Sequence, residues 1–364
     1  MDRRRLVLIG LVLLVSSAGC LSNVDPAPTD NDTGTDDTPT DDFNEALEIH
    51  TINVGQADAT LIIAPSGETM LIDSGDWPND GRTVLAYLDA HDIDRIDHLV
   101  TTHGHADHIG GHAAIIEHYE TERNGIGAVW DSGVPHDSAA YDRYLTAIEE
   151  HDVTLYTTQE GDEIPFDNEA THATVLNPPA NSDKPDDLDY NGVVVLLEFG
   201  ETSALFTGDA GADVEDRLLD AHGDDLDVDL YHAGHHGSKT SSTSEFLDTL
   251  APQATIISSA YDSQYGHPHE ESLAAFAERD IAAYWTAVHG TMIFESDGET
   301  WTVATQTNAT TDPLALREEP EVEAEPASPP TEQEPIAART TGVSLLQERR
   351  STSPSAAVAT GVIA

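Results

Sequence analysis

The sequence predicts an α/β fold in which strands and helices form separate layers. Residues 47–54 alternate between apolar and polar side chains, as a half-buried strand does. Residues 82–91 have the apolar spacing of a helix, and residues 96–100 form an apolar, strand-like run soon after it. Strands that alternate with helices along the chain favour an α/β arrangement over an all-β sandwich.

The remaining elements are expected in a similar alternation up to residue 303. Strands are predicted at residues 60–64, 69–73, 128–131, 193–199, 203–206, 228–231 and 255–259, and helices at 112–119, 138–150 and 213–221. A turn-rich stretch, residues 177–189, is expected to form a mobile loop over the functional site. The span from Leu47 to Val303 is long enough to bury the core of one domain.

The chain is strongly acidic. It contains 68 Asp and Glu residues against 15 Lys and Arg residues, which gives a formal net charge of −53. The acidic residues are spread along the chain and 38% of all residues are hydrophobic, which favours a folded, halophilic protein over a disordered one. We expect the domain to lose structure below about 1 M salt, where screening weakens. Above that ionic strength the Debye length is about 3 Å or less, so the acidity does not exclude a polyanionic substrate.

The amino terminus has the features of an export signal. Three arginines at positions 3–5 precede an apolar run at residues 6–15, which is shorter than the roughly 20 residues that span a membrane. The arginines resemble a twin-arginine signal, and the small residues before Cys20 resemble a lipobox. Residues 1–20 are therefore expected to be a lipoprotein signal peptide, and a lipid on Cys20 to anchor the protein at the extracellular face of the cytoplasmic membrane. The alternative is that residues 6–15 remain as an uncleaved anchor.

Neither flank of the domain offers enough apolar side chains for a core. Residues 21–46 are rich in Asp, Thr, Pro and Asn, which predicts an acidic disordered tether. Residues 308–364 are first rich in Glu, Pro and Thr and then in Ser, Ala, Thr and Arg, which predicts a disordered tail. The folded domain is therefore expected to span residues 47–307.

A cluster of metal-ligating side chains lies directly after a predicted strand. His103 and His105 are two residues apart on an extended segment and can point to the same side, while Asp107 and His108 lie on the turn that follows. This geometry suits two divalent cations about 3.5–4 Å apart that share a water of lowered pKa. The alternative is a histidine-rich turn that faces solvent.

Further acidic and histidine residues follow the ends of other predicted strands. Asp209 is a candidate bridging ligand, and His235 is a candidate terminal ligand of the second metal. Asp73 is expected to accept a hydrogen bond from a histidine of the cluster and so to orient it. His136 lies in a loop that could line the site, although a single loop histidine is more often unrelated to function.

The order and spacing of these motifs resemble the metallo-β-lactamase superfamily and, within it, the hydrolase domain of the ComEC competence proteins. The motifs are Asn53-Val-Gly-Gln-Ala-Asp-Ala59, Leu71-Ile-Asp-Ser-Gly75, Thr102-His-Gly-His-Ala-Asp-His-Ile-Gly-Gly111, Thr207-Gly-Asp209, Gly234-His-His-Gly-Ser238 and Tyr265-Gly-His-Pro-His269. The resemblance implies a four-layer αββα sandwich with a dimetal site at one edge of the two sheets. It also implies that the metal-site residues are His103, His105, Asp107, His108, Asp209 and His235. Asp107 and His267 are the implied catalytic residues, Asp107 at the nucleophilic water and His267 near the substrate.

The chain departs from the pattern of the superfamily in two respects. Many members have another histidine ligand before the bridging aspartate, whereas here His172 comes rather early and Asn191 is nearer to the expected place. The first metal is therefore expected to be weakly held or completed by water. ComEC proteins also carry a multi-helix channel, and no segment after Leu21 has about 20 consecutive apolar residues.

The resemblance implies a metal-dependent hydrolase that uses a metal-activated water. The expected substrate is the phosphodiester bond of extracellular nucleic acid, as in competence. Imidazole and carboxylate ligands without thiolate fit two divalent metal ions, zinc first and manganese second. Two alternatives remain open: hydrolysis of a lactone, thioester or β-lactam by the same water, and a lipid-anchored protein that binds metal or ligand without turnover. The sequence indicates no protein partner.

Overall fold

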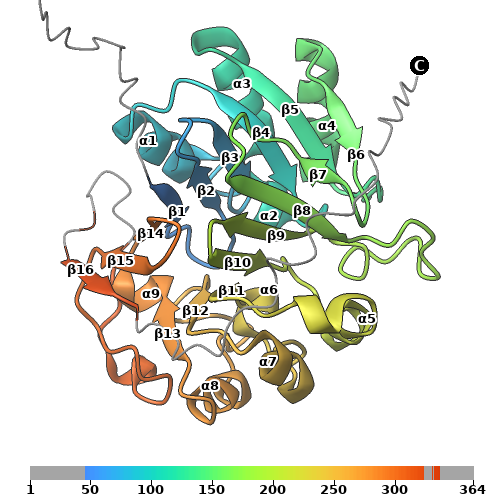
Figure 1. Cartoon of the computed structure of the whole chain (residues 1–364). Coiled ribbons are helices and arrows are strands. Elements are labelled where there is room, and N and C mark those ends of the chain that lie inside the picture. The colour runs from blue at the N-terminus through green and yellow to red at the C-terminus, as the bar shows by residue number, and fades with distance from the viewer. Residues whose placement is uncertain (1–45, 324–329, 331, 337–364) are drawn as a thin grey trace, which may run out of the picture. The chain divides into compact units, whose positions relative to one another are not determined.

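The computed structural model describes residues 46–323, 330 and 332–336. The expected signal peptide with Cys20 lies outside this part, as do the expected tether up to residue 45 and the tail from residue 337. None of the helices in the described part is long and apolar enough to cross a membrane. The described part consists mainly of two sheets and the helices that cover them (Figure 1).

Two mixed sheets form the centre of the described part. The order of the nine-stranded sheet is β16 (Glu332–Pro335), β15 (Trp301–Thr305), β14 (Met292–Ser296), β1 (Leu47–Thr51), β2 (Thr60–Ile63), β3 (Thr69–Ile72), β4 (Ile96–Thr101), β5 (Ile126–Asp131) and β6 (Leu155–Thr157). The order of the seven-stranded sheet is β13 (Ala282–Trp285), β12 (Ala254–Ile257), β11 (Leu230–His232), β10 (Thr202–Phe206), β9 (Val194–Phe199), β8 (Thr171–Asn177) and β7 (Glu163–Ile164). Strands β3 to β6 are mutually parallel, and so are β10 to β13.

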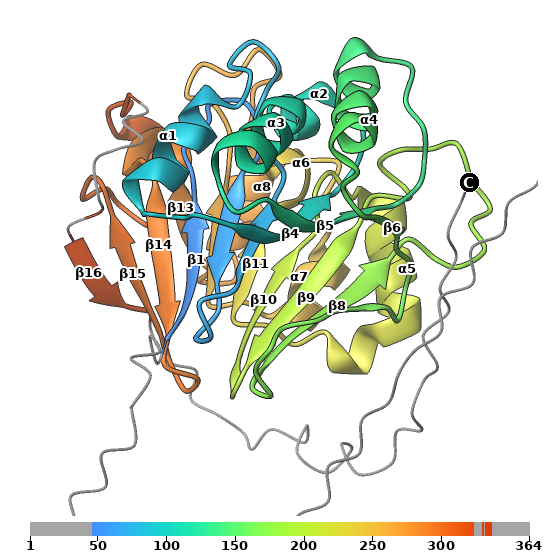
Figure 2. The same cartoon turned by 90° about the horizontal axis from the view of Figure 1, so that it is seen from above.

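Helices cover the outer face of each sheet (Figures 1 and 2). The first sheet carries α1 (Arg82–Ala90), α3 (His112–Glu122) and α4 (Ala139–His151), and the second carries α5 (Ala212–His222), α7 (Ser244–Leu250) and α8 (Glu270–Ala277). The connections contain the short helices α2 (Ala106–Ile109), α6 (Gly234–Gly237) and α9 (Thr286–His289) and the 3₁₀ turns η1 (Gly223–Asp225) and η2 (Leu316–Glu318). The predicted four-layer αββα arrangement is confirmed.

Three hydrophobic clusters hold these layers together. Val100 of the first sheet and Phe206 of the second belong to the cluster between the sheets. Leu88 of α1 packs with the outer face of the first sheet, and Phe246 of α7 packs with the outer face of the second. Burial of apolar surface stabilises each of these contacts, by about 25 cal/mol per Å². The apolar stripes that predicted the helices are therefore the faces that attach them to the sheets.

The parallel strands bring the polar motifs to one edge of the sandwich. His103 comes two residues after β4, and Asp209 comes three residues after β10. The α6 turn follows β11, the parallel neighbour of β10. Parallel strands share one direction, so the residues that follow them meet at the same edge of a sheet. Segments that are more than 100 residues apart in the sequence can in this way contribute to one site.

The described residues beyond position 307 differ from the expected tail. Leu316 is fully buried in the cluster beneath the second sheet, and the Tyr261 hydroxyl donates a hydrogen bond to the Glu319 carbonyl oxygen at 2.9 Å. Strand β16 pairs with β15, and Ile336 is buried between the sheets. Composition did not reveal these contacts because a Pro-rich segment without its own core can still add a strand to an existing sheet. The predicted domain boundary at residue 307 is therefore too early for these residues.

Candidate metal centre

The turn after β4 brings the clustered histidines to the edge of the first sheet. His103 is buried, and His105 has an extended backbone and directly precedes α2. Asp107 and His108 lie within α2, and His108 is fully buried. The chain can turn this tightly because Gly111 has no side chain: a Cβ atom there would lie 2.5 Å from a carbonyl oxygen of the loop after β3.

The turns after β10 and β11 form the opposite side of the centre. Asp209, after β10, is only 4% exposed. His235 and His236 of α6 both have a left-handed backbone, with φ of 51° and 57°. Residues other than glycine pay about 1 kcal/mol or more for this conformation, and such strain is concentrated at functional sites. Here both imidazoles come close to Asp209.

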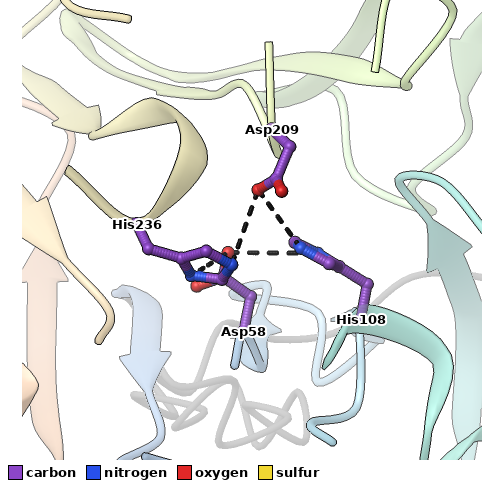
Figure 3. A group of neighbouring side chains, drawn as sticks. All are labelled: Asp58, His108, Asp209 and His236. Carbon is purple, nitrogen blue, oxygen red and sulfur yellow. Dashed lines mark ion pairs between the residues drawn. The ribbon is translucent and has the colours of Figure 1, made fainter. Parts of the chain in front are cut away.

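Two groups of side chains in the described part could each hold a metal ion. The first group, whose side chains converge in Figure 3, consists of Asp58, His108, Asp209 and His236. The second group consists of His103, His105, Asp189 and Asp209. Within each group the potential ligand atoms lie within 4.8 Å of one another. Asp209 belongs to both groups, which is what a bridging carboxylate requires.

Unpaired buried atoms indicate that a cation fits at this point. Among the described residues, Oδ1 of Asp209 and the Nε2 atoms of His108 and His236 are buried without a hydrogen-bond partner. Oδ1 of Asp209 lies 3.2 Å from Nε2 of His108 and 3.6 Å from Nε2 of His236. Buried polar atoms normally have partners, and these atom types are ligands of zinc and manganese. The donor set therefore fits a divalent cation.

Asp58, a member of the first group, and Asp107, beside that group, face different ring nitrogens. Oδ2 of Asp107 lies 3.4 Å from Nε2 of His236, the nitrogen that also approaches Asp209. Oδ2 of Asp58 instead lies 3.5 Å from Nδ1 of His236 and 4.0 Å from Nδ1 of His108. Asp107 is therefore placed to share a cation with the Nε2 atoms. Asp58 is better placed to orient the two rings.

The two histidines of α6 differ in how firmly they are held. Nε2 of His235 lies 3.6 Å from Oδ2 of Asp209, and the His235 side chain is 34% exposed. His236 is 2% exposed, and its Nδ1 lies 2.9 Å from the carbonyl oxygen of Ser258. A hydrogen bond from Nδ1 fixes the ring and leaves Nε2 free to act as a ligand. The sequence indicated His235, and the structure brings both residues to Asp209 with His236 in the more enclosed position.

Asp73 orients His108, as the sequence predicted. It follows β3 with a left-handed backbone, φ 58°, and its carboxylate accepts hydrogen bonds from the Thr102 N–H at 2.9 Å and the Thr102 hydroxyl at 2.6 Å. Nδ1 of His108 lies 2.7 Å from Oδ2 of Asp73. An imidazole that donates from Nδ1 to a carboxylate presents Nε2 as its ligand atom.

The electrostatics of the centre favour positive charge among its carboxylates. Burial, and then the neighbouring His108, lower the pKa of His103 to about 3, so that this imidazole is neutral and able to ligate. Burial disfavours ionisation of Asp209, but the nearby imidazoles of His108 and His236 outweigh burial and lower the pKa of its carboxyl group. Burial opposes charge on His108 as well, yet Asp209 and Asp73 raise its pKa. A bound cation would satisfy the same carboxylates.

A further buried histidine, His112, supports the turn that carries His108. Its Nδ1 lies 2.5 Å from the Ser74 hydroxyl and its Nε2 lies 2.9 Å from the Thr101 hydroxyl. The Ser74 N–H in turn donates to the His108 carbonyl oxygen at 2.8 Å. Burial lowers the pKa of His112 to about 4, so the ring is neutral at neutral pH. His112 thus connects the end of β4 to the metal-site turn.

We expect acid to destabilise the fold partly through His112. Because its pKa is about 4 in the folded protein and 6.5 as the ordinary value, the unfolded chain binds more protons between these pH values. The stability that depends on the neutral ring is present above pH 6.5 and is lost as the pH falls toward 4. Urea denaturation across this range should show a shallower fall in the free energy of unfolding for His112→Gln than for the parent protein. Equal slopes would contradict this role.

Two further histidines named from the sequence, His267 and His136, lie close to histidines of the centre. His267, between β12 and α8, is 5% exposed, and its ring centroid lies 5.6 Å from that of His235. The ring of His136 lies 5.3 Å from that of His105. His172 lies within β8 and belongs to neither group.

Three members of the groups are absent from the ligands expected from the sequence. Asp58 lies in a recognised motif, residues 53–59, but the motif alone assigns no role to its carboxylate. His236 is the immediate neighbour of the expected ligand His235. Asp189 ends the turn-rich stretch that was expected over the site, and its spacing carries no signal that it reaches His103.

The fold and the centre together define a class of αββα proteins with a His/Asp site at the sheet edge that could hold metal ions. Residues 52–260 match the family model of the metallo-beta-lactamase superfamily, which is more than half of the chain. The protein belongs to the metallo-β-lactamase superfamily, and the resemblance inferred from its motifs is confirmed.

Competence proteins are among its relatives. ComE operon protein 3 of Bacillus subtilis is 28% identical over 261 residues, which cover 67% of this chain and 32% of that protein. Competence protein ComA of Neisseria gonorrhoeae is 25% identical over 216 residues, which cover 58% of this chain and 27% of that protein. The chain therefore spans less than a third of the length of these relatives. The fold was also compared with solved structures. The crystal structure of the short form of human tRNase Z matches 58% of this chain, and the match covers 92% of the tRNase Z chain. The TM-score is 0.38 and the sequence identity is 13%.

Proposed function

We propose that the protein is a metal-dependent hydrolase of phosphodiester bonds in extracellular nucleic acid. The observation that carries this proposal is the pair of His/Asp groups that share Asp209 at the edge of an αββα sandwich. Imidazole and carboxylate ligands at such an edge suit activation of a water for hydrolysis. The similarity to a protein named for competence supports nucleic acid as the substrate.

The proposed metal ligands come from both sides of the centre. They are His103, His105, Asp107, His108, Asp209 and one histidine of α6. We assign His236 as this ligand and His235 to the substrate side, because His236 is buried and fixed by a hydrogen bond whereas His235 is a third exposed. Two divalent cations bound here, zinc or manganese, would lower the pKa of a shared water and stabilise negative charge on the substrate.

Asp107 and His267 are the proposed catalytic residues. Burial disfavours ionisation of Asp107, but the nearby His236 imidazole, 3.4 Å away, and the charge of His108 lower the pKa of its carboxyl group, so that it accepts a proton or a hydrogen bond from the attacking water. Burial, and then the neighbouring His236, lower the pKa of His267 to about 4. His267 is therefore neutral at neutral pH and assists the leaving group by donating a hydrogen bond rather than by carrying a positive charge.

The surface beside His267 suits a nucleotide. Tyr265 is 57% exposed, and its ring centroid lies 5.7 Å from that of His267, so that a base can stack next to the reacting phosphate. Lys239 is exposed nearby, and its backbone N–H donates to Nδ1 of His269 at 3.1 Å. At high ionic strength the acidic surface repels a polyanion only over about 3 Å.

Hydrolysis assays at high salt test the proposed function. The purified protein loaded with zinc or manganese is expected to cleave a bis-aryl phosphodiester and single-stranded DNA, and a chelator is expected to abolish both activities. Cleavage of a lactone, thioester or β-lactam without cleavage of a phosphodiester would assign a different substrate to the same centre. Two bound metals without any of these activities would instead identify a metal-binding or ligand-binding protein.

We further propose that the domain is held outside the cell by a lipid on Cys20, after export through a twin-arginine signal in residues 1–20. Residues 21–46 would then be the tether that lets the domain reach extracellular polymers. This proposal is supported by the lipobox-like residues before Cys20. Membrane retention of a Cys20→Ser variant would show that residues 6–15 are the anchor instead.

A further inference from the structure

We propose that Asp189 is a ligand of the first metal, so that this subsite is built from two imidazoles and two carboxylates. The inference rests on the metal centre proposed above and extends it to a residue outside the predicted ligand set. Oδ1 of Asp189 lies 3.3 Å from Nδ1 of His105 and 3.7 Å from Nε2 of His103. Oδ2 of Asp209 lies 3.8 Å from the same nitrogen of His103. The two carboxylates and the two rings thus enclose one point.

The atoms that face this point lack other partners or crowd one another. Oδ1 of Asp189 is buried and has no hydrogen-bond partner among the described residues, although the side chain as a whole is 38% exposed. Nε2 of His103 and Nδ1 of His105 are only 2.9 Å apart. Two carboxylates within 4.8 Å of each other repel unless positive charge lies between them. A cation bound by all four side chains removes this repulsion and satisfies the unpaired oxygen.

The backbone around Asp189 is braced from several directions. The side-chain amide of Asn177, at the end of β8, donates to the carbonyl oxygens of Tyr190 at 2.9 Å and Gly192 at 2.6 Å. The amide of Asn191 donates to the carbonyl oxygens of Lys184 at 2.7 Å and Asp187 at 2.6 Å. Asp189 is therefore presented by a turn whose shape two asparagines maintain.

These contacts also explain why neither Asn191 nor His172, the two residues considered from the sequence, completes the subsite. Asn191 is 2% exposed, and its side-chain nitrogen is engaged with the loop backbone. His172 lies within β8, before the loop begins. The Val193 N–H donates to the Thr102 carbonyl oxygen at 2.7 Å, which joins the end of the loop to the residue before His103. The loop thus brings Asp189 to the place where a third histidine would otherwise be needed.

This ligand set has a chemical consequence for metal choice. Carboxylate oxygens suit manganese, whereas imidazole suits zinc. A subsite with two carboxylates should therefore prefer zinc over manganese less strongly than one with three imidazoles. Asp189→His, which exchanges a carboxylate for an imidazole, should increase the zinc preference.

Metal-binding measurements on the full chain at high salt test the proposal. We expect the parent protein to bind two Mn²⁺ ions in isothermal titration calorimetry. Asp189→Asn is expected to bind one Mn²⁺ ion with unchanged affinity and the other with affinity reduced about tenfold or more, since a charged ligand is lost. Asp186→Asn, which neutralises an exposed carboxylate in the same loop, is the matched control and should bind two ions like the parent. For Asp189→His, competition between Zn²⁺ and Mn²⁺ should shift toward Zn²⁺ at one subsite.

Metal binding is measured without a substrate, so the result tests the role of Asp189 separately from the proposed function. Two Mn²⁺ ions bound by Asp189→Asn with the affinities of the parent would overturn the role of Asp189, whatever the activity of the enzyme. If the parent protein binds two metals but does not hydrolyse a phosphodiester, only the proposed substrate would be overturned. If Asp189→Asn fails to fold by circular dichroism, the Asp189→His variant decides: an unchanged ratio of zinc to manganese affinity would contradict the proposal.

Discussion

Replacing Asp209 by alanine is expected to remove at least one of two bound metals and to reduce hydrolysis by about 10³-fold or more. Asp209 is the residue common to both groups of potential ligands. Its Oδ1 atom faces His108, and its Oδ2 atom faces His103 at 3.8 Å. Loss of the shared carboxylate therefore weakens both subsites, and bound metal ions contribute several kcal/mol to the stabilisation of the transition state.

Elemental analysis after exhaustive dialysis, together with a phosphodiesterase assay, measures this effect. His118→Ala is the control, because His118 lies on α3, close to Asp89 and Glu122 and outside both groups. It should retain two metals and the activity of the parent protein. Two tightly held metals in the Asp209→Ala variant would refute the bridging role.

The second large effect is expected to distinguish the adjacent histidines of α6. His236→Ala should lose one metal and most activity, because His236 is buried and its Nε2 faces both Asp107 and Asp209. His235→Ala should keep two metals and lose activity through weaker contact with the substrate, because its side chain is 34% exposed. The two variants therefore separate metal content from turnover.

The pair is well matched because both positions have a left-handed backbone, with φ of 51° and 57°. Alanine is strained in this conformation at either position, so a general loss of stability would affect the variants alike. Metal content should be measured by elemental analysis, and KM and kcat should be measured separately on a phosphodiester. If His236→Ala keeps both metals and His235→Ala loses one, His235 is the ligand, as the sequence indicated.

Much of the architecture could be predicted from local patterns. The helix expected at residues 138–150 is observed at Ala139–His151, and Ser138 caps it by accepting a hydrogen bond from the Tyr141 N–H at 3.2 Å. A capping serine and a stripe of apolar residues are signals that lie within one segment. By contrast, β8 was not among the expected strands, and the described residues after 307 join the core only through partners elsewhere in the chain.

The α/β class could be predicted from the sequence, and His103, His108 and Asp209 could be proposed as site residues because they follow the ends of predicted strands. These predictions depend on short-range periodicity and on the rule that polar residues after parallel strands meet at one edge. The more enclosed position of His236 relative to His235, the place of Asp58 behind the imidazole rings and the approach of Asp189 to His103 could be seen only in the folded protein. Left-handed backbone conformations and a hydrogen-bonded loop set these side-chain directions, and neither follows the regular alternation of a strand or the period of a helix.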